Sequence, residues 1–64
     1  MTATELQVIA EELKAEIRWK QMEIALRPHL TVYAKLMEEG VTRAKAELET
    51  VRKAMRLTTE YTAA

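Results

Sequence analysis

Residues 25–31 read ALRPHLT, and the proline in this stretch divides a chain that is otherwise rich in helix-forming residues. Pro28 lacks a backbone N–H and disfavours helical geometry at the preceding residue, Arg27. Within a helix it would cost about 3 kcal/mol, but the first position of a new helix tolerates it. The sequence therefore predicts either a tight turn or a kink near residues 26–29.

The segment before this proline is predicted to form one long helix over residues 3–26. Ala, Glu, Lys, Leu, Met and Gln dominate it, and all of these are strong helix formers. Thr2 and Glu5 have the spacing of a capping box, and Thr4 and Gln7 make a second possible one. Either pair could begin the helix.

The segment after the proline is predicted to form a second helix over residues 28–39 and a third over residues 43–60. Gly40 suits the position just past a helix end, and Thr42 can cap the helix that follows. No stretch alternates apolar and polar residues for long enough to indicate a strand. The expected fold is all-α, with residues 1–64 in one small domain: a helical hairpin or a three-helix arrangement with a long first helix.

The small size of the chain limits what it can bury on its own. With 64 residues, it is expected to bury only about 60% of the surface that its unfolded form exposes. The sequence has no Cys, so neither a disulfide nor a cysteine-ligated metal can staple the fold. We therefore expect the fold to be completed by oligomerisation or by docking on a partner.

The first predicted helix carries two apolar stripes on nearly opposite faces, because residues advance by about 100° each. A helix that packs on one neighbour needs only one stripe. Two stripes predict two neighbours, one within the chain and one in a partner. The first stripe comprises Leu6, Ile9, Ala10, Leu13, Ile17 and Ile24, and the second Val8, Ala15, Trp19, Met22 and Leu26. The expected partner-binding residues are Leu6, Ile9, Leu13 and Ile17 in the first stripe and Trp19, Met22 and Leu26 in the second.

Apolar residues also recur every 11 positions along the chain. This period corresponds to about 3.67 residues per turn, which is typical of a nearly straight or right-handed coiled coil. The repeat would make the chain a single kinked rod unless Pro28 and Gly40 reset its phase, and we favour the reset because either residue can interrupt a helix. The recurring positions are Met22, Tyr33, Ala44 and Met55, then Leu26, Met37 and Leu48, then Leu30 and Val41.

No constellation of residues predicts catalysis, a metal site or a cofactor. His29 is the only histidine, and the di-iron signature of helical bundles would need a Glu where Leu26 stands. Glu11 and Glu12 point about 100° apart on a helix, so they do not form a carboxylate dyad. A chain with one Gly has no phosphate-binding loop. We expect neither an enzyme nor a small-molecule substrate.

The last predicted helix carries a basic face. Lys45, Arg52 and Arg56 share it, Lys53 lies at its edge, and Glu49 interrupts the row. Such a row could follow a phosphate backbone, as in a small helical nucleic-acid-binding regulator. Because ten basic residues balance ten acidic ones, the favoured interpretation is a solvated face that stabilises the helix C-terminus. Nucleic acid is therefore the alternative partner.

These features together predict a non-enzymatic structural or adaptor subunit that packs helix against helix. It would work in a homo-oligomer or in a larger assembly such as a phage or another particle. No apolar run approaches the roughly 20 residues that cross a bilayer, and the start, MTATELQ, lacks the basic and apolar regions of a secretory signal. We expect no membrane partner, and a location in the cytoplasm or in a particle assembled inside the cell.

Overall fold

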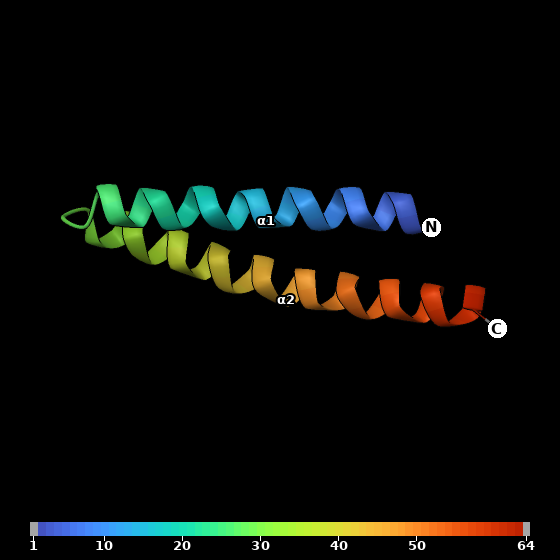
Figure 1. Ribbon diagram of the computed structural model, residues 1–64. Coiled ribbons are helices and arrows are strands. Elements are labelled where there is room, and N and C mark those ends of the chain that lie inside the picture. Colours follow the sequence, from blue (N-terminus) through green and yellow to red (C-terminus); the bar gives the residue numbers. More distant parts are fainter. Residues whose placement is uncertain (1, 64) are drawn as a thin grey trace.

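The fold is an antiparallel hairpin of two α-helices. The computed structural model describes residues 2–63, and the side chains of residues 2–58. α1 (Ala3–Leu26) and α2 (Thr31–Ala63) lie side by side and run in opposite directions, as Figure 1 shows. α2 has 33 residues against 24 in α1, and it extends beyond the N-terminal end of α1 (Figure 1). The predicted all-α class is confirmed, since residues 2–63 contain no strand.

The start of α1 is fixed by a capping box. The Thr2 hydroxyl accepts a hydrogen bond from the Glu5 backbone N–H at 3.1 Å, and the Thr2 N–H donates to the Glu5 carboxylate at 3.2 Å. Two backbone groups at the helix end are thereby satisfied. The sequence allowed two possible starts for this helix. The observed capping box is the earlier one, so Thr4 and Gln7 lie inside the helix.

Pro28 makes a turn rather than a kink. α1 ends at Leu26, and Arg27 has φ −129° and ψ 53°, outside the helical region, as expected for a residue before proline. The Leu30 N–H donates to the Arg27 carbonyl at 3.2 Å, which closes a four-residue turn with Pro28 at its second position, where its fixed φ is favourable. The Leu30 carbonyl then accepts from the Ala34 N–H at 2.8 Å. α2 therefore begins at Thr31, not at residue 28 as predicted.

The predicted break at Gly40 does not occur, and the three-helix alternative is therefore wrong. α2 continues through Gly40 without a positive φ, and Thr42 does not cap a helix but donates its hydroxyl to the Glu38 carbonyl of the preceding turn at 3.1 Å. A single Gly within a helix costs only about 1 kcal/mol. Packing of α2 along α1 exceeds that cost, so the helix is not interrupted.

The core is a strip between the two helices, in the half of the hairpin away from the turn. The buried side chains of α1 face those of α2, and partly buried apolar residues extend the strip. Between residues 18 and 40 no residue is buried, so the half of the hairpin next to the turn has no fully buried residue. The buried residues are Leu6, Ala10, Leu13, Ile17, Val41, Ala44 and Leu48, and the partly buried ones packed against them are Ile9, Val51 and Met55.

The 11-residue repeat follows the inner face of α2 but does not cross the turn. Ala44 and Leu48 are buried, and Tyr33, Met37 and Met55 are half-buried. The earlier members of the repeat, Met22 and Leu26, belong to α1 and are exposed. The single-rod alternative is therefore wrong, because the turn at Pro28 reverses the chain direction.

The hairpin exposes more surface than a compact protein of its mass. A folded monomer of 7.4 kDa is expected to expose about 4,200 Å², whereas this chain exposes 4979 Å². Its Cα radius of gyration is 14.9 Å, against about 11 Å for a compact chain of this length. Two helices in a rod of 52 × 14 × 14 Å can cover only one face of each other.

Candidate interaction surfaces

The first apolar stripe of α1 is used within the chain. Leu6, Leu13 and Ile17 are buried, and Ile9 is partly buried against the core. They face α2, whose apolar residues supply the other side of the core. Of the two stripes, these four residues therefore form the one that packs within the chain.

The second stripe faces away from α2 and is exposed. Trp19, Met22 and Leu26 retain 52%, 59% and 66% of their accessible surface, and Val8 retains 51%. No described part of the chain covers this outer face of α1, which we define by Val8, Ala15, Trp19, Met22 and Leu26. Its binding to a partner stays a prediction.

More apolar side chains are exposed around the turn, and neither predicted apolar stripe of the first helix includes them. Leu30, Val32 and Leu36 keep 40%, 76% and 57% of their surface. Together with His29, Thr31 and Tyr33 they line a hollow of about 640 Å³. Six of the eight large exposed hydrophobic residues in the described part of the chain fall between residues 19 and 36, so exposed apolar surface is concentrated where the core is absent.

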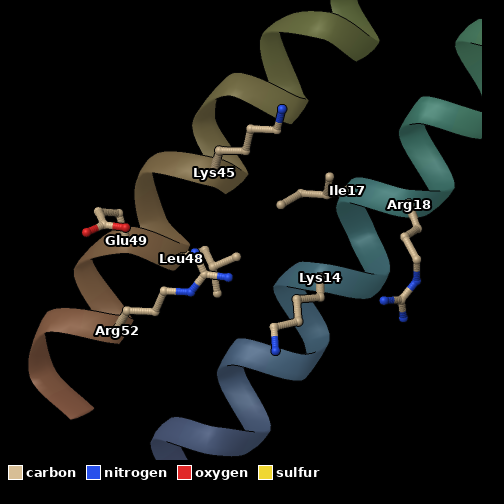
Figure 2. Close-up of a pocket in the computed structure, with 7 residues that line it drawn as sticks. All are labelled: Lys14, Ile17, Arg18, Lys45, Leu48, Glu49 and Arg52. Atoms are coloured by element: carbon tan, nitrogen blue, oxygen red, sulfur yellow. The ribbon is translucent and has the colours of Figure 1, made fainter. Parts of the chain in front are cut away.

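A basic groove runs between the helices on another side of the hairpin. Lys14 and Arg18 of α1 and Lys45 and Arg52 of α2 line it, and Glu49 contributes one carboxylate. Figure 2 shows the side chains of Lys14 and Arg52 extending into the space between the two helices. The groove has a volume of about 450 Å³, and its apolar lining comes from Ile17 and Leu48.

The structure divides the four predicted basic residues. Lys45 and Arg52 lie in the groove. Arg56 lies beside Glu49, with its Nη2 3.9 Å from the carboxylate, and lines an adjoining hollow of about 420 Å³ together with Glu49, Arg52 and Met55. Lys53 lines neither. The sequence alone did not indicate Lys14 and Arg18. Their position opposite Lys45 and Arg52 depends on how the two helices face each other.

The ion pairs of the described side chains leave most groove cations available. The Lys14 ammonium lies 3.2 Å from the Glu11 carboxylate, and both side chains are substantially exposed. Among residues 2–58, Arg18, Lys45 and Arg52 form no ion pair within 4.0 Å. The groove thus carries four cations and one carboxylate, although the whole chain has a net charge of zero.

The described part of the chain lacks two other kinds of functional feature. Its His and Glu side chains nowhere gather in a group of three that could hold a metal ion. Neither helix, over its described residues, is apolar enough along a sufficient length to cross a membrane. No protein-family model, curated protein or solved structure matches this chain.

Proposed function

We propose that this chain is a non-enzymatic structural or adaptor subunit that packs the outer face of α1 against another helix. The other helix belongs to a second copy or to a larger multi-subunit assembly, such as a phage or another particle built inside the cell. The observation that carries this proposal is the exposure of Trp19, Met22 and Leu26 in the isolated hairpin, at 52%, 59% and 66%.

The energetic argument compares this exposed face with the small core. Burying a large apolar side chain completely contributes about 1.5–3 kcal/mol. More than half of Trp19, Met22 and Leu26 remains in water, so covering all three would contribute about 2–5 kcal/mol. A single core in a chain this short rarely supplies more than about 3–5 kcal/mol. The apolar burial that the outer face offers is therefore similar in size to what the core supplies, before the cost of association is subtracted.

The type of surface also fits an interface. Trp and Met are enriched where proteins bind each other, while charged residues are depleted from the centre of such patches. The outer face of α1 places Trp19 and Met22 on adjacent turns with Ala15 before them and Leu26 after them. A helix laid along this row would contact an uninterrupted apolar strip.

The test measures mass in solution by sedimentation for the wild type and for Met22→Glu. Wild type should exceed the mass of one chain, and Met22→Glu should reduce the assembly to monomers that remain helical. Gln21→Glu is the matched control, because it adds the same charge at the neighbouring exposed position and should leave the assembly intact. Trp19 is the only tryptophan, so assembly should shift its fluorescence to shorter wavelength. A stably folded wild-type monomer, unchanged by Met22→Glu, would contradict the proposal.

A further inference from the structure

The neutral net charge of the chain conceals a local excess of positive charge. Four cations and one carboxylate line the groove between α1 and α2. We infer that this groove, formed by Lys14, Arg18, Lys45 and Arg52, binds the phosphate backbone of a nucleic acid without regard to base sequence. The groove differs from the outer face of α1, although Arg18 neighbours Ala15 and Met22 on the surface of that helix. This inference goes beyond the proposed packing function.

The groove cations come from both helices, which the sequence could not indicate. Lys14 and Arg18 are separated by four residues, or about 6 Å along α1, and Lys45 and Arg52 by seven residues, or about 10 Å along α2. Duplex DNA carries one negative charge per about 1.7 Å of axis when both strands are counted. A duplex lying along the groove would therefore present enough phosphates to pair with all four cations.

The lining distinguishes a phosphate backbone from an acidic helix of a partner protein. Ile17 and Leu48 form the apolar part of the groove, but they are only 9% and 6% exposed. A docked amphipathic helix would gain little from covering them, because apolar binding energy scales with the area removed from water. The ligand must therefore be held by charge, which favours closely spaced phosphates.

The lining offers few groups that read base sequence. No aromatic side chain lines the groove, so there is no platform on which a base could stack. No Asn or Gln is present to pair with adenine, so only the Arg and Lys side chains, which can bind guanine, are available to contact a base edge. The guanidinium groups of Arg18 and Arg52 form no ion pair among residues 2–58, and guanidinium groups bind phosphate oxygens in a bidentate manner.

The row of cations continues toward the open end of the hairpin. Arg56 lines the adjoining hollow, which shares Arg52 and Glu49 with the groove. The Glu49 carboxylate is 3.9 Å from the Arg56 guanidinium. The positive charge of Arg56 therefore offsets part of the repulsion between Glu49 and a bound phosphate. The groove residues Lys14, Arg18, Lys45 and Arg52 remain the ones on which binding should depend most.

The test is the salt dependence of binding to a fluorescently labelled DNA duplex of arbitrary sequence. If about four phosphates are neutralised, the association constant should fall about 100-fold between about 50 and 200 mM salt. Arg18→Gln with Arg52→Gln should weaken binding at about 50 mM salt by at least tenfold and reduce the fall over the same range to about tenfold.

The matched control is Lys35→Gln with Arg43→Gln. It also removes two positive charges, but at exposed positions that do not line the groove. It should change the binding affinity by less than about threefold. Circular dichroism should show that both double variants remain helical. Equal loss of binding in the two variants would overturn the inference, as would absence of binding at low salt. Displacement of the duplex by polyglutamate, charge for charge, would assign the groove to acidic proteins, and preferential binding to anionic vesicles would assign it to membranes. Either result would also overturn it.

Discussion

The side chain of Lys20 in α1 lies against Gly40 in α2, where a larger residue would meet it. A Cβ built on Gly40 would stand 2.8 Å from the Lys20 Nζ and 3.2 Å from its Cδ and Cε. The same ammonium lies 2.6 Å from the Glu16 carboxylate. The glycine that the sequence marked as a helix end is thus a position where the end of a long side chain from α1 lies against α2.

Gly40→Ala should stabilise the hairpin by about 0.5–1 kcal/mol. Ala is favoured over Gly by about 1 kcal/mol in a helix interior, and the atoms in the way belong to the flexible end of Lys20. Urea denaturation followed by circular dichroism measures the change. The same substitution in a Lys20→Ala background should gain slightly more, because no side chain must move. Destabilisation by more than about 1 kcal/mol would indicate that Lys20 cannot be displaced.

Leu30→Asp should stabilise α2 by about 1 kcal/mol. The Leu30 carbonyl accepts the first hydrogen bond of α2 from the Ala34 N–H, so Leu30 occupies the N-cap position without a side-chain acceptor. Asp would supply that acceptor and a charge suited to the helix dipole. The thermal midpoint should rise with this variant, whereas Leu36→Asp, also at an exposed position but inside the helix, should not raise it. Equal effects of the two changes would refute the capping explanation.

Leu13→Ala should destabilise the protein by about 2–5 kcal/mol and remove most of its helical signal. Leu13 is 8% exposed and belongs to the central cluster, and the cavity left by a buried Leu adds to the lost transfer free energy. Leu26→Ala should leave the helical content of dilute protein almost unchanged, because Leu26 is 66% exposed. Comparable loss of helix in both variants would contradict the observed orientation of α1.

Pro28→Ala should lower the free energy of unfolding by about 0.4–1 kcal/mol. Proline suits the second position of the turn between Arg27 and Leu30 and restricts the unfolded chain, and alanine restores that freedom. Chemical denaturation measures the effect. An increase in stability would instead show that the proline strains the turn.

The sequence by itself determined the helical class, the end of α1 and the place of a break at Pro28, but it left open which capping box begins α1 and whether the break is a turn or a kink. These depend on interactions between residues close in the chain: the Thr2 and Glu5 capping box, the helix-forming composition and the missing N–H of Pro28. The two stripes of α1 were also visible, because side chains repeat at the helical period.

The tertiary structure decided which stripe is inside, whether Gly40 ends a helix and which cations meet. The propensity of Gly to break a helix is worth only about 1 kcal/mol, and the contacts between α1 and α2 exceed it. The groove that joins Lys14 and Arg18 to Lys45 and Arg52 depends on the rotation of each helix about its axis. That rotation is set by the packing of Leu13 and Ile17 against Val41, Ala44 and Leu48, and such contacts between distant segments cannot be read from local sequence.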